Sequence, residues 1–167
     1  MRWLARRRVA LGFILGAVVL WLAQPTPASL VRGAVIALIG EAIRIWAAGH
    51  LEKSREVTRS GPYRFTRHPL YLGSSIIALG IAVASASLWV AAIVALYVFT
   101  AIPAAILSEE AHLREKFGGD YDAYKSRLAP PMARPFSLAR ARFNREHHTI
   151  GGVLLGFALL AGKVFFA

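Results

Sequence analysis

Residues 60–73, with the sequence SGPYRFTRHPLYLG, gather groups that can bind a polar ligand at the edge of an apolar stretch. Arg67 provides a fixed cation, and His68 provides an imidazole that can donate or accept a hydrogen bond. The aromatic rings of Tyr63 and Tyr71 can cover a flat base or a cation. A loop that only connects two helices does not need this combination, so the segment predicts one wall of a binding site.

A pair of carboxylates, Glu109 and Glu110, can supply the opposite wall. The pair follows residues 69–107, which carry no charge and are long enough for two membrane-crossing helices. A hairpin of two such helices returns both of its ends to the same face of the membrane. Cationic groups and carboxylates would then meet in one pocket, which suits a zwitterionic ligand with a carboxylate, an ammonium group and hydroxyls.

Each half of this pattern also has an ordinary structural explanation. GPY is a common turn sequence with Pro62 at the corner, and Arg67 with His68 can be basic residues that flank a membrane helix. Ser108 can cap a helix whose first turn holds the two glutamates. The occurrence of both halves at the two ends of one predicted hairpin favours a binding site.

Composition places the chain among membrane proteins. Its 167 residues are about the length of one domain, 56% of them are hydrophobic, and the mean hydropathy is +0.50. The formal net charge is +11, but the basic residues form short clusters between apolar runs, so we expect no nucleic-acid partner. The sequence has no cysteine, no glycine-rich nucleotide fingerprint and no HExxH motif, and we expect no metal site.

The apolar runs predict an all-α integral membrane protein, with about five transmembrane helices and with interfacial helices on the cytoplasmic side. The runs are 9–23, 30–48, 69–107, which should break into two helices near 85–87, and 150–166. The first run has the basic start and apolar centre of a signal peptide, and we expect the protein to retain it as a span.

These runs divide a single domain into three parts. Residues 1–48 hold the first two transmembrane helices, 49–149 form the expected catalytic core with the loop, hairpin and interfacial segment, and 150–167 form the last helix. Of the 20 Lys and Arg residues, 17 fall on one side of a five-helix arrangement. This asymmetry predicts a multi-pass protein whose N-terminus and candidate site face the cytoplasm.

Charged and amphipathic residues outside the two walls give further expectations. Glu41 and Arg44 lie three residues apart in the second run, so they can form an ion pair on one helix face or contribute to a site. His50, just after that run, is another candidate. Between 108 and 149, apolar residues recur at spacings of three and four, which predicts a pair of amphipathic surface helices interrupted at 118–119.

Three sequence blocks together resemble one known family. They are RIWAAGHL, GPYRFTRHPLYLG and EEAHLREKFGGDYDAYKSRL, all within residues 40–130. The pattern GPYxxxRHPxYxG, followed by a glutamate pair and then by YxxY, is similar to the isoprenylcysteine carboxyl methyltransferases and the bacterial phospholipid methyltransferases. The resemblance implies a helical membrane fold without a Rossmann domain, which binds S-adenosylmethionine at the cytoplasmic interface.

The resemblance also implies which residues contact the cofactor. Residues 55–58 would line the nucleoside, the stretch 68–71 would hold the cofactor, and Glu110 would take the acidic position of the family. The cofactor-binding residues predicted in this way are Arg55, Glu56, Val57, Thr58, Tyr63, Arg67, His68, Pro69, Leu70, Tyr71, Glu109 and Glu110. No catalytic base is assigned.

One departure from the family bears on the substrate. The prenylcysteine enzymes carry an arginine about one helical turn before the glutamate, where it serves the substrate carboxylate, whereas residues 105–107 are apolar here. A lipid amine, an isoprenoid-like acid or a small thiol stays open as the methyl acceptor. The expected function is S-adenosylmethionine-dependent methylation of a lipidic, isoprenoid or other hydrophobic small molecule at the cytoplasmic membrane face.

Two other functions fit the same sequence. Membrane reductases of related fold use NADPH, although the short loop 49–68 and the glutamate pair favour a methyl donor. A non-catalytic module could instead bind anionic lipid headgroups through its basic segments. Membrane lipids are expected partners under each of these hypotheses.

Overall fold

The computed structural model describes residues 14–166, and every regular element in this part of the chain is helical. A short helical stretch, 14–22, precedes the labelled elements. These are α2 (Pro27–Ala48), the 3-10 turn η1 (Gly61–Arg64), α3 (Pro69–Ser85), α4 (Leu88–Phe117), α5 (Gly119–Lys125), α6 (Leu138–Phe143) and α7 (Glu146–Phe166). The all-α prediction is confirmed for these residues. The basic start of the chain and the beginning of its first apolar run lie outside the described residues.

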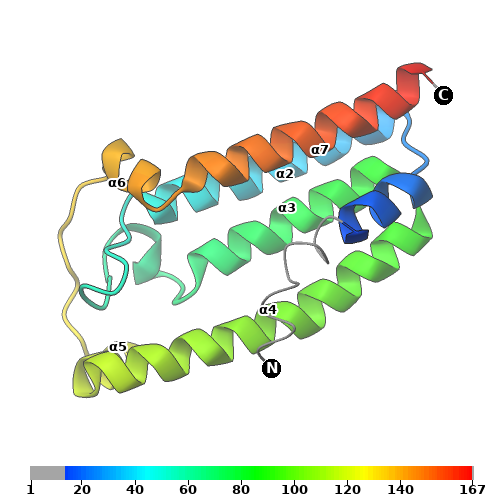
Figure 1. The fold of residues 1–167 in the computed structure, drawn as a ribbon. Helices are drawn as coiled ribbons and strands as arrows, with labels where there is room; N and C mark the ends of the chain where they lie inside the picture. The colour runs from blue at the N-terminus through cyan, green and yellow to red at the C-terminus, as the bar shows by residue number, and fades with distance from the viewer. Residues whose placement is uncertain (1–13, 167) are drawn as a thin grey trace.

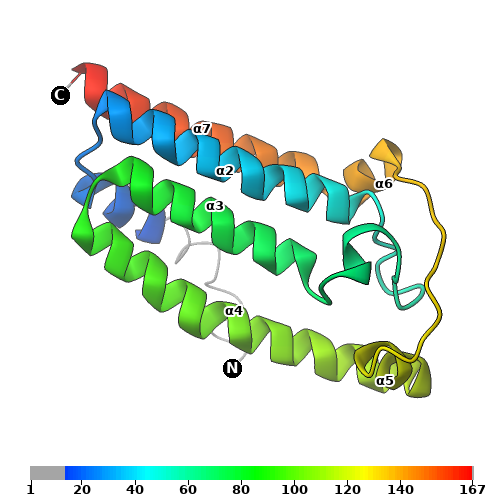
Figure 2. The same cartoon turned by 180° about the vertical axis from the view of Figure 1, so that it is seen from behind.

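The long helices α2, α3, α4 and α7 form the body of the molecule (Figure 1, Figure 2). Helix α2 packs along α3, and α7 contacts both. Helices α3 and α4 are close at their connection and diverge toward α5. The connection is short because Ala86 adopts a left-handed conformation, with φ of 47°, and the Ser87 side chain caps α4. The predicted break at 85–87 is therefore confirmed.

Small residues let α2 and α3 approach each other closely. A Cβ atom added to Gly80 would lie 2.7 Å from the backbone nitrogen of Ala37 and from the carbonyl oxygen of Gly33. One added to Gly40 would lie 2.7 Å from the carbonyl oxygen of Gly73. Because backbone atoms occupy this space, the contact needs residues without side chains, as in many helix pairs within membranes. The two closely packed helices therefore hold both ends of the segment that connects them.

Helices α4 and α7 are long and apolar enough to cross a membrane, as predicted for these parts of the chain. Large side chains of α4 such as Trp89 and Phe99 are exposed, as expected for a surface in contact with lipid. Helix α3 is apolar but has 17 residues, and α2 carries Arg32, Glu41 and Arg44 among its 22 residues. The total of five spans stays a prediction.

The predicted start of the surface helices is wrong. Residues 108–117 continue α4 as one helix, so Ser108 is not a helix cap. Since no glycine or proline follows Pro103 before position 118, the helix runs on to Gly118, whose φ of 50° suits glycine. The predicted interruption at 118–119 is confirmed, and α5 follows it.

The ion pair that Glu41 and Arg44 could form is not present. The Arg44 guanidinium bonds with Glu146 of α7 instead, with its Nε 2.7 Å from Oε1 and its NH2 3.1 Å from Oε2. The long arginine side chain reaches across to α7 and matches the carboxylate with two parallel bonds. Both carboxylate oxygens of Glu41 are buried and have no hydrogen-bond partner within residues 14–166. The Arg44–Glu146 pair thus ties α7 to α2.

Candidate functional site

A cavity of about 560 Å³ lies between the loop after α2, the turn η1, the start of α3, the final turns of α4, and α5. The two ends of the predicted hairpin therefore meet, as expected. The predicted site residues in its lining are Glu56, Val57, Thr58, Tyr63, Arg67, His68, Pro69, Leu70, Tyr71 and Glu109. Arg55 and Glu110 are outside the lining.

The turn before α3 has its shape because Gly61 packs against a histidine. Gly61 has a φ of 57°, and a Cβ atom added there would collide with the ring of His50. His50 is buried, and its Nδ1 lies 3.2 Å from Ser60 Oγ. Burial, together with nearby Arg140 and Arg134, lowers the pKa of His50, so the imidazole stays neutral. His50 supports the turn and is not part of the cavity lining.

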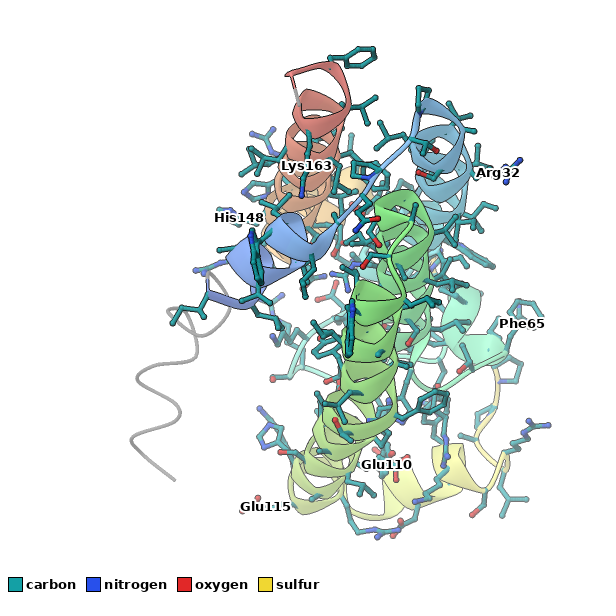
Figure 3. All side chains as sticks on the ribbon, turned by 90° about the vertical axis from the view of Figure 1, so that its right-hand side faces the viewer. Arg32, Phe65, Glu110, Glu115, His148 and Lys163 are labelled. Carbon is teal, nitrogen blue, oxygen red and sulfur yellow. The ribbon has the colours of Figure 1, made fainter. Side chains whose placement is uncertain are left out.

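Glu110 lies outside the cavity lining and contacts His68, which is part of it. The His68 Nε2 lies 3.1 Å from Glu110 Oε1, and the Lys125 ammonium donates to Glu110 Oε2 at 2.7 Å. Arg67 lies 3.5 Å from the same carboxylate. Figure 3 shows Glu110 on α4 with α5 beside it. These contacts fix the imidazole ring of His68 at the wall of the cavity, so Glu110 acts through His68 in this structure.

Glu109 has different surroundings from its neighbour. Successive residues of an α-helix point about 100° apart, so Glu109 and Glu110 cannot face the same space. Glu109 lines the cavity beside Tyr71 and forms no ion pair within the described residues. The structure therefore separates the glutamate pair into one carboxylate that faces the cavity and one that positions the imidazole.

Tyrosine side chains form the wall next to α5. The Tyr124 hydroxyl donates to the carbonyl oxygen of Tyr63 at 2.8 Å, which joins α5 to the turn η1. Tyr121 is almost completely buried, and its ring centroid lies 6.3 Å from that of Tyr124. Burial raises the pKa of Tyr124 to about 12 and that of Tyr121 to about 12. These phenols therefore remain neutral hydrogen-bond donors at physiological pH.

The segment between α5 and α7 clamps the loop that follows α2. Arg134 pairs with Glu56 at 2.6 Å, and Arg140 donates to Glu52 Oε1 at 2.8 Å and to the carbonyl oxygen of Gly49 at 2.6 Å. The Asn144 amide adds two bonds to backbone carbonyl oxygens at the end of α2 and just after it, both at 2.9 Å. We call residues 134–144 the strap. It holds the loop 49–58 in the place where the loop lines the cavity.

Arg44 and Ser74 also line the cavity. A site role was one of the two expectations for Arg44, whereas Ser74 was not among the predicted site residues. The Arg44 NH1 donates to Ser74 Oγ at 2.5 Å and to the carbonyl oxygen of Leu70 at 3.3 Å. Its other nitrogens bond with Glu146 and Thr149. Because each guanidinium nitrogen already has an acceptor, Arg44 shapes the cavity and has little capacity left to bind a ligand.

Metal-ligating side chains do not gather in the described part of the chain. Within residues 14–166, no group of three or more His, Asp and Glu side chains is arranged to hold a metal ion. The cavity lining combines cationic, carboxylate, aromatic and apolar groups, which together suit an organic ligand with both charges.

Comparison with known proteins identifies the family. Residues 8–120 match the family model described as phospholipid methyltransferase. The chain belongs to the phospholipid methyltransferase family. The match covers the hairpin, the turn η1 and the glutamate pair, whereas the strap lies beyond it. No solved structure matches the chain.

Two curated relatives carry names that refer to metal resistance. The nickel-cobalt-cadmium resistance protein NccN of Alcaligenes xylosoxydans xylosoxydans is 34% identical over 111 residues, which are 65% of this chain and 50% of the relative. The cobalt-zinc-cadmium resistance protein CzcN of Cupriavidus metallidurans is 34% identical over 87 residues, which are 51% of this chain and 39% of the relative. The matched region thus spans about half or less of these relatives.

Proposed function

We propose that this protein is an S-adenosylmethionine-dependent integral membrane methyltransferase that acts on a lipidic, isoprenoid or other hydrophobic small molecule. The observation that carries the proposal is the cavity, which brings residues from both predicted walls together at one end of the helices. Its volume of about 560 Å³ falls within the range of roughly 300–1,000 Å³ that small-molecule sites occupy. Membership of the phospholipid methyltransferase family supports the reaction class.

The side chains in the lining fit the two charges of the cofactor. Arg67 and His68 can bind a carboxylate. Glu52 and Glu56 also face the cavity, but they are paired with arginines of the strap. Glu109 has no such partner among the described residues, so its carboxylate is available for an ammonium group or for hydroxyls. The tyrosine rings of the lining can cover the adenine or the sulfonium.

When bound, the cofactor supplies a methyl group on a sulfonium, which an acceptor removes by in-line displacement. The contribution of the protein is positioning, which can account for about 7–11 kcal/mol of a barrier in ideal cases. The fixed ring of His68 and the clamped loop 49–58 would hold the donor in one orientation. The neutral phenols of Tyr63 and Tyr124 would keep that side of the cavity closed to water. No side chain is assigned as the base for the acceptor.

The apolar part of the lining points to the class of acceptor. Ala105, Leu113 and Leu70 lie in the same cavity as the charged groups. Ala105 occupies the region where an arginine would serve a prenylcysteine carboxylate, so such a substrate is disfavoured. We propose that a hydrophobic acceptor reaches the cavity from the lipid phase, between α3 and α4, which diverge toward α5, and that this end of the molecule faces the cytoplasm.

Isothermal titration of the detergent-purified protein with S-adenosylhomocysteine tests this proposal. We expect saturable binding to the wild type, and an affinity at least about tenfold lower in the His68→Ala, Glu110→Ala double variant, because charge-assisted contacts at the wall are lost. Glu115→Ala serves as the control, since Glu115 is exposed on the same helix and forms no ion pair within residues 14–166.

If the well-folded wild type does not bind S-adenosylhomocysteine, the proposed methyltransferase function is rejected. Titration with NADPH follows in that case, because a related reductase would bind it in the same cavity. Equal loss of affinity in the double variant and in Glu115→Ala would show that the effect comes from helix α4 in general and not from the wall formed by His68.

A further inference from the structure

A second cavity adjoins the first on the outer side of the turn η1. Its volume is about 380 Å³, and its lining consists of Tyr63, Arg64, Phe65, Thr66, Arg67, Tyr124, Lys125 and Arg127. Tyr63, Arg67 and Tyr124 belong to the linings of both cavities, so they form the partition between them. Arg64, Phe65 and Arg127 line only the second cavity, which can therefore be tested separately.

The second cavity has a large excess of positive charge. Four of its lining residues are cationic, and no carboxylate is in the lining. Glu110 is outside the lining, and its carboxylate pairs with two of these cations, Lys125 at 2.7 Å and Arg67 at 3.5 Å. Arg64 and Arg127 form no ion pair within the described residues. Like charges held around one concave space repel each other unless an anion lies between them, so the cavity favours an anionic ligand.

The backbone places Arg127 at the rim in an uncommon conformation. Arg127 follows α5 with a φ of 59°, which lies in a region of backbone conformation that residues other than glycine, asparagine and aspartate rarely adopt. Its backbone N–H donates to the carbonyl oxygen of Tyr124 at 3.1 Å, which closes the end of the helix. Arginine is also the residue best suited to phosphate, since its planar fork can donate two parallel bonds.

Apolar side chains beside this cavity suggest that its ligand belongs to a membrane. Phe65 lines the cavity and is 77% exposed, and Figure 3 shows it pointing away from the helices. Trp46 lies next to it, with ring centroids 6.3 Å apart, and Leu128 is 81% exposed just after Arg127. Exposed aromatic rings next to cations are typical of the zone where a protein meets lipid headgroups. A free ion would need only the cations.

We propose that the second cavity binds the phosphate group of an anionic phospholipid, with Arg64 and Arg127 as its principal ligands. Phe65 and Leu128 would lie among the first carbons of the lipid chains. The partition of Tyr63, Arg67 and Tyr124 keeps this lipid apart from the cavity assigned to methyl transfer, so it is a resident lipid and not the methyl acceptor. The assignment does not depend on the proposed methyltransferase activity.

Native mass spectrometry of the full chain in a non-ionic detergent tests the assignment. The protein is offered equal amounts of phosphatidylglycerol and phosphatidylcholine with identical chains, and the bound lipid is counted. The test variant is Arg64→Gln, Arg127→Gln. The control variant, Arg32→Gln, Arg142→Gln, loses the same charge at exposed positions outside the second cavity. Thermal unfolding by circular dichroism checks that each protein is folded.

We expect the wild type and the control variant to retain phosphatidylglycerol in preference to phosphatidylcholine. The test variant should retain roughly tenfold less phosphatidylglycerol, because two charge-assisted contacts are removed. Equal retention by the test and control variants would overturn the site in favour of general charge attraction. Displacement of the lipid by inorganic phosphate would overturn the identification of the ligand as a phospholipid and would assign the cavity to a free phosphate ion. If the double variant does not fold, the two single variants are compared with Arg32→Gln in the same way.

Discussion

Helices α2 and α3 meet through backbone, whereas α3 and α4 separate toward the site and are joined there by side chains. In the first pair, an added methyl group at Gly80 would lie 2.7 Å from two backbone atoms. Near the cavity, the second pair is joined by Glu110 of α4 and His68 at the start of α3, and the hydrogen bond of Tyr124 with Tyr63 joins α5 to the turn η1 beside it. The wall on the α2–α3 side is therefore supported by close backbone packing, whereas the wall formed by α4 and α5 is joined to the rest of the site by a few polar side-chain contacts.

This difference fits the proposed function, in which the protein holds a polar cofactor and admits a hydrophobic acceptor. The loop 49–58 follows directly after α2, and the strap holds it through Arg134, Arg140 and Asn144. The α4 wall carries the carboxylate of Glu109 and takes no part in the glycine contact between α2 and α3. Changes to the wall on the α2–α3 side should lower stability, whereas changes to the α4 wall should lower ligand affinity with little effect on unfolding.

The largest loss of stability is expected from Gly80→Ala. The new methyl group has no free space between α2 and α3, and we expect a cost of about 3 kcal/mol, near the upper end for overpacking. The apparent unfolding temperature in detergent measures the effect. Gly156→Ala is the control, because a methyl group there meets no atom within 4 Å. An equal fall in both variants would contradict the firm contact between the two helices.

Arg140→Ala should have the next largest effect. It removes the donors to Glu52 and to the Gly49 carbonyl oxygen, and a loss of about 2 kcal/mol is typical for hydrogen bonds with a charged partner. Both the unfolding temperature and the affinity for S-adenosylhomocysteine should fall, because the strap holds the loop that lines the cavity. Arg142→Ala, at an exposed position of α6, should change neither quantity. Unchanged affinity in Arg140→Ala would mean that the strap does not shape the site.

Tyr124→Phe tests the wall formed by α4 and α5, which polar side-chain contacts hold in place. The variant loses one hydrogen bond to the Tyr63 carbonyl oxygen, which contributes about 1 kcal/mol. We expect a several-fold lower affinity for S-adenosylhomocysteine and a small change in unfolding temperature. Tyr97→Phe, on the exposed side of α4, is the matched control. A large fall in unfolding temperature with unchanged affinity would reverse the roles assigned to the two walls.

The smallest effect is expected in the dependence of stability on alkaline pH. The pKa of Tyr124 is raised to about 12 from an ordinary value of 10.0, mainly by burial. Its contribution to stability is therefore complete below pH 10 and is lost as the pH rises toward 12. Unfolding temperatures measured across this window should fall less steeply in Tyr124→Phe than in the wild type. Identical slopes would show that the Tyr124 phenol is not shielded from water.

Parts of the site were predictable because they follow from local sequence. The turn GPY, the break at 85–87 and the interruption at Gly118 depend on residues next to them in the chain. Of the two alternatives for Arg44, pairing with Glu41 used the same local reasoning and is not realised, because Glu146, 102 residues away in the chain, offers two well-aligned oxygens. The strap was missed for the same reason, since no local spacing indicates a contact between Arg140 and Glu52.

Local sequence accounts for the interruptions between the helices and for the concentration of chemical groups at the two ends of one hairpin. Short-range sterics, hydropathy and charge set these features, and each acts within a few turns of helix. The packing of the helices, which no local pattern shows, decided that Glu109 faces the cavity while Glu110 lies outside its lining and contacts His68, because the rotation of α4 relative to α3 and α5 sets which side is inward. It also decided that Arg64 and Arg127 share a second cavity, since residues so far apart in the chain are brought together only by the packing of α5 on the turn.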